Sequence, residues 1–108
     1  MTAYNVVRMR VKEGREKDFI DKNWQVDPEA MKGLKKISIV STGDRNYCLI
    51  GEWEDSDAIA AAGPIMIGAL DTFRDTLEDL GTGSGVTEAM SGEAVIVGYG
   101  AGQAAAAR

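Results

Sequence analysis

The sequence contains no histidine, one cysteine and two prolines among its 108 residues. The absence of histidine excludes histidine-based general acid–base catalysis, Ser-His and Cys-His nucleophile pairs, and the usual zinc and haem ligand sets. A single cysteine cannot form an internal disulfide, which is typical of a reducing, cytoplasmic setting. The composition therefore excludes most familiar catalytic chemistries without indicating one, and it predicts neither a metal nor a cofactor.

Long apolar runs and an excess of positive charge are also missing. No stretch of about 18 apolar residues is present, so no membrane span is predicted, and the N-terminal residues lack the layout of a secretion signal. Twelve Lys and Arg stand against 17 Asp and Glu, a net charge of −5. Nucleic acids and anionic membranes are bound chiefly by excess Lys and Arg, so neither is an expected partner.

What is present is a hydrophobic content of 44%, enough for the core of one small domain. In the first half, apolar residues alternate, then recur at helical spacing, then alternate again. The short segment 42–45 contains a glycine and predicts a β-hairpin turn. The predicted elements are a strand over 4–11, a helix over 15–25, and strands over 34–41 and 46–54.

The second half begins with the cluster 55–57, whose short oxygen-bearing side chains are typical of a helix N-cap. Because Pro64 has no backbone N–H, two helical pieces are expected, a short one to Ala62 and a main one from Pro64 to Leu80. A glycine-rich loop over 81–85 and a last strand over 93–99, containing the run Ala94-Val95-Ile96-Val97, complete the pattern.

The order strand-helix-strand-strand-helix-strand predicts an α+β, ferredoxin-like βαββαβ domain over 1–99, with a Gly/Ala-rich tail over 100–108. Two helices cover only one face of the antiparallel four-stranded sheet. Several strands are apolar on both sides, as at Val6-Val7 and Leu49-Ile50. A second apolar face needs a cover, and another copy of the chain is the simplest one. We therefore expect a homodimer through the sheet face.

Three segments, VVRMRVKEGREKDFIDKNW, YCLIGEWEDSDA and AAGPIMIGALDTFRDTLEDLG, resemble antibiotic biosynthesis monooxygenase-like proteins of the dimeric α/β-barrel superfamily. The resemblance covers roughly residues 4–99. It rests on strand order, the tryptophan that ends the third strand and the long second helix. Such proteins include cofactor-free oxygenases of aromatic polyketides and quinols, haem-degrading enzymes and proteins of unknown role. The resemblance implies a ligand site between each sheet and its own helices.

The haem-degrading branch uses an Asn on the first strand, then Trp and His on the second helix. Asn5 matches the first position, but the second helix has neither of the others. Haem degradation is therefore not expected.

For an oxygenase or a ligand-binding protein, the candidate catalytic residues are Asn5 and Arg8. Either could donate to a carbonyl or stabilise a phenolate. Each also has a structural interpretation: Asn5 as a strand-edge polar residue, and Arg8 as the ion-pair partner of a carboxylate on a neighbouring strand, such as Glu52 or Glu54.

Candidate substrate-binding residues are those that could line or close a pocket for an aromatic molecule. Trp24 is either a core anchor or a pocket wall, and Trp53 belongs to the core or the dimer interface. Arg74, among acidic neighbours, is most simply a surface ion-pair partner. Cys48 is interpreted as a small buried hydrophobe. The candidates for substrate contact are Trp24, Tyr47, Trp53, Arg74 and, at the end of the last strand, Tyr99.

Two functions remain open. One is a dimeric protein that binds a small apolar or aromatic molecule without catalysis. The other is a cofactor-independent monooxygenase acting on a quinol- or anthrone-like substrate. A catalytic site should show at least two donors converging in an apolar cavity between sheet and helices.

Overall fold

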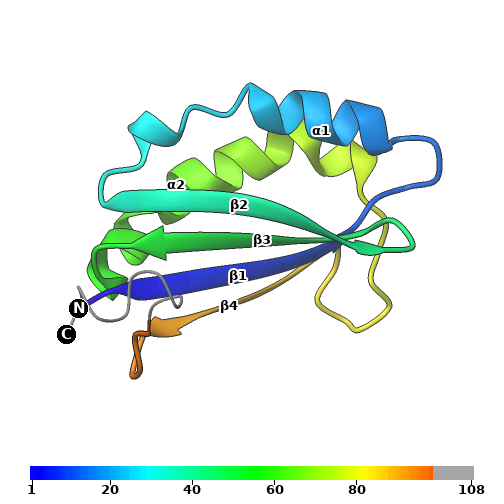
Figure 1. The fold of residues 1–108 in the computed structure, drawn as a ribbon. Helices are drawn as coiled ribbons and strands as arrows, with labels where there is room; N and C mark the ends of the chain where they lie inside the picture. Colours follow the sequence, from blue (N-terminus) through cyan, green and yellow to red (C-terminus); the bar gives the residue numbers. More distant parts are fainter. Residues whose placement is uncertain (99–108) are drawn as a thin grey trace.

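Two helices cover one face of a four-stranded antiparallel sheet with the strand order β2-β3-β1-β4, in a computed structural model that describes residues 1–98 (Figure 1). This confirms the predicted α+β ferredoxin-like architecture. The predicted tail over 100–108 and the candidate Tyr99 lie outside the described residues. The elements are β1 (Ala3–Arg10), α1 (Glu16–Trp24), η1 (Pro28–Ala30), β2 (Leu34–Gly43), β3 (Asn46–Trp53), α2 (Ser56–Phe73), η2 (Arg74–Thr76) and β4 (Thr87–Glu93).

Alternation along the central strand β1 separates a helix-facing side from an open side. Ala3, Asn5 and Met9 are buried under the helices and Val7 packs against the same core, whereas the even-numbered residues of the strand face away. Directly paired residues of antiparallel strands share a face. The register Asn5↔Gly51 and Asn5↔Ser91 therefore carries the helix-facing side across to β3 and β4.

The hairpin between β2 and β3 turns at Asp44 and Arg45, whose φ angles of 52° and 64° both lie in the left-handed region. Two central residues in the left-handed region are typical of a type I′ turn, whose twist matches that of the flanking strands. Arg45 is also fixed through its guanidinium, since Nη1 donates to the Val11 carbonyl at 2.7 Å. The predicted hairpin is confirmed, and β2 continues two residues further than expected, to Gly43.

Helix α2 begins as predicted, because the Asp55 carboxylate accepts from the Ala58 N–H at 2.8 Å. The predicted break at Pro64 is wrong, since one helix runs through it to Phe73. The missing proline N–H removes a single helical hydrogen bond. Burial of Ala62 and Phe73 on the two sides of Pro64 keeps both segments on the same sheet.

The predicted continuation of this helix to Leu80 is also wrong. After Phe73 the chain tightens into η2, and Leu77 then pairs with Val11 as an isolated antiparallel bridge. The Thr76 hydroxyl is buried and donates to the Phe73 carbonyl at 2.6 Å, which occupies one carbonyl at the helix end. Leu77 and Leu80 are buried as the apolar spacing indicated, but they are not helical.

The last strand lies earlier than predicted, over Thr87–Glu93 rather than 93–99. The turn that joins Leu80 to Gly85 through a 2.9 Å backbone hydrogen bond brings the chain beside β1 early. Apart from Ala89 and Met90, the residues that reach β1 are polar or glycine, as is common in an edge strand with one neighbour. The apolar run that favoured the later position is instead exposed.

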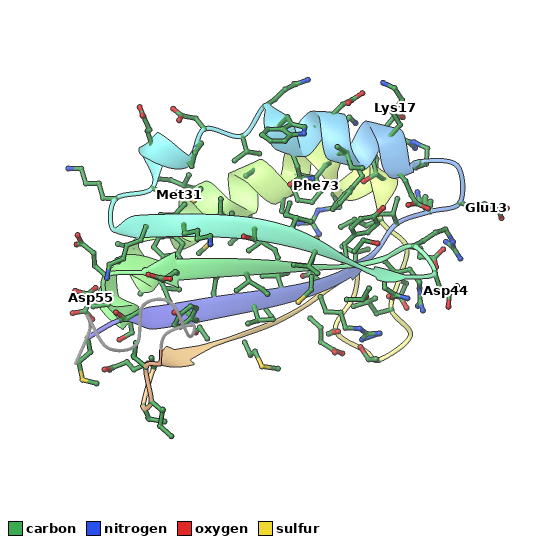
Figure 2. The ribbon with its side chains drawn as sticks, viewed as in Figure 1. Glu13, Lys17, Met31, Asp44, Asp55 and Phe73 are labelled. Atoms are coloured by element: carbon green, nitrogen blue, oxygen red, sulfur yellow. The ribbon has the colours of Figure 1, made fainter. Side chains whose placement is uncertain are left out.

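The core lies between the helices and the sheet in two clusters. Figure 2 shows Phe73 in this layer, with Lys17 and Glu13 on the outside. One cluster contains Met9, Val11, Phe19, Tyr47, Phe73 and Leu77. The other contains Met31, Trp53 and Ala62. Among residues 1–98, no helix is long and apolar enough to cross a membrane.

Candidate functional site

Asn5 lies on the helix-facing side of β1, between the two core clusters, and is only 6% exposed. The indole Nε1 of Trp53 donates to Asn5 Oδ1 at 2.8 Å. Because an indole N–H can only donate, this contact fixes the amide with its oxygen toward Trp53 and its nitrogen away. The other contact of the amide, from Nδ2 to the Met66 sulfur, measures 3.7 Å.

Gly51 makes this arrangement sterically feasible. A Cβ at position 51 would lie 2.3 Å from Asn5 Oδ1 and 2.8 Å from Trp53 Nε1. A strand glycine with another group close above it is a recognised sign of a special contact. The amide and the indole therefore occupy the space that a side chain at position 51 would fill.

The Asn5 amide nitrogen is a buried hydrogen-bond donor on the helix-facing side whose acceptor is weak. It carries two N–H donors, and its one described acceptor is a thioether, a weak one. Buried donors normally have good acceptors, because leaving one unsatisfied costs about 1–3 kcal/mol. A ligand carbonyl or phenolate oxygen would be a stronger acceptor than the sulfur.

An apolar strip runs from this amide toward the edge strand β2. Ile37 pairs with Gly51 and Ile39 with Leu49, so both isoleucines lie on the helix-facing side. They are nevertheless 39% and 37% exposed. The helices leave this edge of the sheet partly uncovered, and the strip leads from solvent toward Asn5.

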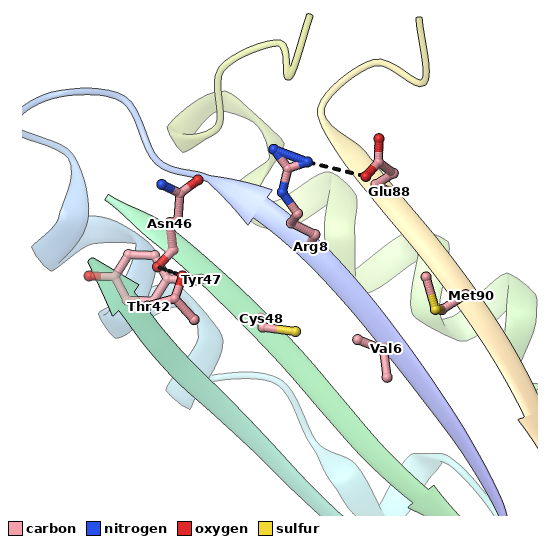
Figure 3. Close-up of a pocket in the computed structure, with 8 residues that line it drawn as sticks. All are labelled: Val6, Arg8, Thr42, Asn46, Tyr47, Cys48, Glu88 and Met90. Carbon is pink, nitrogen blue, oxygen red and sulfur yellow. Dashed lines mark hydrogen bonds and ion pairs between the residues drawn. The ribbon is translucent and has the colours of Figure 1, made fainter. Parts of the chain in front are cut away.

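Two hollows open elsewhere on the described part of the chain. One, of about 410 Å³, lies on the open face of the sheet beside Val6, Cys48 and Met90 (Figure 3). The other, of about 420 Å³, lies between the end of α1, η1 and the Ile65–Thr72 face of α2. Neither is the expected cavity with two converging donors. Around Asn5 the space is occupied by Trp53 and Met66.

Arg8 lies on the opposite side of the sheet from Asn5, so the two candidate catalytic residues do not converge. Its guanidinium Nη1 pairs with Glu88 of β4 at 3.1 Å (Figure 3). The predicted ion pair thus exists with a different carboxylate from Glu52 or Glu54. Hydrogen bonding from the Thr82 hydroxyl, and then from Arg8, lowers the pKa of Glu88.

Trp24 is 84% exposed, so its interpretation as a core anchor is wrong, and it lines neither of the two hollows. It ends α1 five residues after Phe19, the one fully buried residue of that helix. At 100° per residue, five positions rotate a side chain by about 140°, away from the buried face. The helical spacing of the apolar residues in α1 does not show that only the side around Phe19 packs against the sheet.

The remaining candidates have structural partners. Tyr47 is buried against Phe19, with ring centroids 4.9 Å apart. Its hydroxyl donates to Glu16, and this hydrogen bond, followed by burial, raises the pKa of Tyr47. Arg74 pairs with Asp71 at 3.0 Å on the surface.

Trp53 is 1% exposed and belongs to the core, as one of its interpretations predicted. Cys48 is only partly buried and lies on the open face, so the expectation of a small buried hydrophobe is not met within one chain. In the described range 1–98, no three His, Cys, Asp or Glu side chains are grouped so that they could hold a metal ion.

The roles of Gly51, Ile37, Ile39 and Met66 were not predicted from the sequence. A glycine inside an otherwise regular strand pattern was the available signal for Gly51. No local pattern indicates that the helices leave the β2 edge partly open.

Solved structures of known proteins share this fold. A Bordetella bronchiseptica protein, provisionally assigned as an antibiotic biosynthesis monooxygenase, is 15% identical with a TM-score of 0.69, over 88% of this chain and 98% of that chain. SnoaB, a cofactor-independent oxygenase from Streptomyces nogalater solved as a mutant, is 18% identical with a TM-score of 0.67, over 89% of this chain and 95% of its own.

A protein of unknown function from Nitrosomonas europaea is also 18% identical, with a TM-score of 0.69 over 93% of this chain and 95% of that chain. No family model matches the sequence, and no curated protein matches it with significant similarity. The chain therefore has the fold of antibiotic biosynthesis monooxygenase-like proteins. At these identities the likeness extends to the fold alone.

Proposed function

We propose that this protein is a sheet-face homodimer that binds a small apolar or aromatic molecule between sheet and helices, without catalysing its conversion. The observation that carries the proposal is the buried Asn5 amide, whose nitrogen has only the Met66 sulfur as its described acceptor. A planar ligand entering over Ile37 and Ile39 would displace Met66, an adaptable side chain. Its carbonyl or phenol oxygen would then accept from Asn5 Nδ2.

The dimer is supported by the open face of the sheet. One row across this face contains Ser38, Ile50, Val6 and Met90, of which Ile50 is 37% and Met90 70% exposed. A largely apolar row that crosses an uncovered face of a sheet is typical of an interface. The flanking rows contain charges of both signs, such as Arg8 with Glu88, and a symmetric partner could match them. A cytoplasmic location is part of the proposal and rests on the single cysteine.

Binding is tested with dihydroxyanthraquinone, an aromatic probe with carbonyl oxygens, in a Trp24→Phe background. Trp53 is then the tryptophan that remains, and it contacts the site. The account predicts quenching of its fluorescence and a loss of affinity of about tenfold or more in Asn5→Ala, equivalent to roughly 1.4 kcal/mol.

Arg74→Gln is the matched control, because Arg74 pairs only with Asp71 among its described contacts. Affinity should be unchanged in this variant. A probe whose affinity falls in Arg8→Gln while Asn5→Ala binds normally would move the site to the other face of the sheet and overturn the assignment.

A second function rests on the same amide. A cofactor-independent monooxygenase would bind the anion of an anthrone, with Asn5 stabilising the charge on its oxygen. Dihydroxyanthrone and O₂ would give dihydroxyanthraquinone and water: one oxygen atom forms the new carbonyl, and the other leaves with the two methylene hydrogens. SnoaB is an oxygenase of this cofactor-independent kind.

Oxygen uptake with dihydroxyanthrone distinguishes the two functions. A rate above the spontaneous oxidation that falls in Asn5→Ala, but not in Arg74→Gln, would favour the monooxygenase. A rate equal to the spontaneous one, together with probe binding, supports the binding protein.

A further inference from the structure

The connection from α1 to β2 makes few hydrogen bonds to the rest of the fold. Figure 1 shows it passing above β2 before that strand begins. The hydrogen bonds described for residues 25–32 all have their partners within residues 22–34. Among residues 1–98, none of these bonds reaches α2, β1 or β3. The backbone of residues 25–32 is therefore not fixed to the elements beside it.

Two apolar side chains hold this segment against the core. Met31 is 5% exposed and belongs to the cluster of Trp53 and Ala62. Val26 packs against the same cluster. The segment thus rests on Trp53, the residue whose indole orients the Asn5 amide. Segments held by a few apolar contacts, without hydrogen bonds to their neighbours, open at a lower free energy than the whole domain.

Both ends of the segment are fixed. At the end of α1, the Lys22 ammonium pairs with Asp75 at 3.0 Å. At the start of β2, the Gly33 carbonyl accepts from the Glu54 N–H at 2.8 Å. Gly33 has a φ of 85°, and a Cβ there would lie 2.6 Å from the Cβ of Ala58. The chain therefore stays in place at both ends, while the residues between them can move as a strap.

There is open space on both sides of the strap. On one side, the hollow of about 420 Å³ separates it from the Ile65–Thr72 face of α2. On the other side, Ile37 and Ile39 of β2 are 39% and 37% exposed, although they face the helices. Met66, which contacts the Asn5 amide, packs against the same cluster as the strap. The strap can therefore move without displacing a helix or a strand, and its movement makes room for Met66.

We propose that residues 25–32 form a strap that lifts from Trp53 to admit the ligand and then closes over it. Met31 and Val26 are the side chains that leave the core cluster and return to it. The inference rests on the binding site of the proposed function and describes how a ligand enters and leaves that site. A strap is a barrier in both directions, so it sets the rates of binding and release. The affinity depends on the contacts of the closed state, chiefly the one with Asn5.

Hydrogen exchange tests the opening of the strap. The Met31 amide donates to the Pro28 carbonyl at 3.2 Å, and in the free protein it should exchange at least about a hundredfold faster than the amides of the central strand β3. Saturating dihydroxyanthraquinone should slow it at least about tenfold. The Leu80 amide is the matched control, because it also makes one loop hydrogen bond, to Gly85, and its side chain is buried like that of Met31. Its exchange should not change with the probe.

A cross-link tests whether this opening controls access. Ala30 of the strap and Ala69 of α2 line the same hollow. In a Cys48→Ser, Trp24→Phe background, Ala30→Cys and Ala69→Cys are joined by a short bis-maleimide, and stopped-flow quenching of Trp53 gives the rate constants. The control is the same protein with both thiols capped by N-ethylmaleimide. Compared with that control, the cross-link should lower the association and dissociation rate constants at least about tenfold each and change the dissociation constant by less than about twofold.

The two measurements separate the strap from the binding function. Equal rate constants in the cross-linked and capped proteins overturn the strap and leave binding intact. A loss of affinity without slower binding and release also overturns it, because the hollow itself would then hold the ligand. If the probe does not bind, the proposed function is overturned and exchange in the free protein decides on the strap. Fast exchange of the Met31 amide then supports the strap, and exchange as slow as that of β3 overturns it.

Discussion

The indole of Trp53 donates a hydrogen bond to the amide oxygen of Asn5 at 2.8 Å, diagonally across β3 and β1 and above Gly51. In the strand register Trp53 is opposite Ala3, and Asn5 is opposite Gly51. The contact therefore requires a glycine at position 51. It also requires that the indole of Trp53 points back along β3 toward that position. It also orients the amide nitrogen away from Trp53, which is what makes Asn5 a donor for a ligand.

Gly51→Ala should destabilise the fold by about 1–3 kcal/mol, the usual effect of overpacking a filled site. The added methyl would lie 2.3 Å from Asn5 Oδ1, so the amide or the strand must shift. Chemical denaturation measures the change in the free energy of unfolding. Gly92→Ala is the control, because no atom lies within 4 Å of a Cβ at that strand position. Equal effects of the two variants would contradict the packing described at Asn5.

Asn5→Ala and Trp53→Phe should be coupled in a double-mutant cycle. Asn5→Ala alone leaves the buried indole N–H without its acceptor, at a cost of about 1–3 kcal/mol. In the Trp53→Phe background that N–H is absent, so the same change should cost less. The expected coupling is about 0.5–3 kcal/mol. Additive effects on the free energy of unfolding would mean that the hydrogen bond does not stabilise the protein.

The two tryptophans should differ sharply in environment. Trp24→Phe leaves the fluorescence of a tryptophan that is 1% exposed, whereas Trp53→Phe leaves that of one 84% exposed. Iodide should therefore quench Trp53→Phe strongly and Trp24→Phe weakly. Trp24→Ala should change the free energy of unfolding by no more than about 0.5 kcal/mol, as is usual for exposed positions. Weak quenching of Trp53→Phe would show that Trp24 is covered, for instance by a partner.

Asp75→Asn should remove part of the pH dependence of stability in acid. Hydrogen bonding from Lys22 of α1, and then from Arg15, lowers the pKa of Asp75 below its ordinary value of 3.8. The unfolded state therefore binds a proton before the folded state does. The stabilisation is fully present above about pH 3.8 and is lost as pH falls through the lower folded-state pKa.

Urea unfolding at several pH values measures this effect. The stability difference between the wild type and Asp75→Asn should shrink as the pH falls through that range. Asp71→Asn is the control, because it breaks an ion pair with Arg74 and leaves both ion pairs of Asp75, with Arg15 and Lys22, intact. A difference that grew on acidification would contradict the direction of the shift.

Met90→Lys should weaken the dimer, because Met90 is 70% exposed on the open face, where it lies beside Val6 on the edge strand β4. Burying a new ammonium there without a partner should raise the dissociation constant by at least about tenfold, or 1.4 kcal/mol. Sedimentation equilibrium measures it, with Ile67→Lys on α2 as the control for an equally drastic surface change. A dimer weakened by Ile67→Lys and unaffected by Met90→Lys would place the interface on the helices.

The order of strands and helices along the chain, the hairpin and the Asp55 cap could be predicted because each depends on residues that are close together in the sequence. Alternation identifies a strand, and the short glycine-containing segment between two alternating runs identifies the turn. The position of β4 could not be predicted in this way. Most of its residues are polar or glycine, and the adjacent run Ala94–Val97 is more typical of a strand than the strand itself.

The candidate site could be predicted in part. Asn5 could be chosen as a candidate because its amide can donate to a ligand oxygen. Alternation along the strand already places Asn5 and Arg8 on opposite faces of the sheet, since one position is odd and the other even. The contact between Asn5 and Trp53 is diagonal and joins residues 48 positions apart, so it depends on the register of two strands. The exposure of Trp24 depends on how narrow a face of α1 packs on the sheet, which helical spacing does not determine.

Native mass spectrometry of the protein with dihydroxyanthraquinone tests the central claim most directly, because it reports assembly and binding together. The account predicts a dimer that carries up to one probe per chain, and an Asn5→Ala dimer that carries much less. A protein that remains free of probe at concentrations well above micromolar, whether as a monomer or as a dimer, would contradict the proposed binding function.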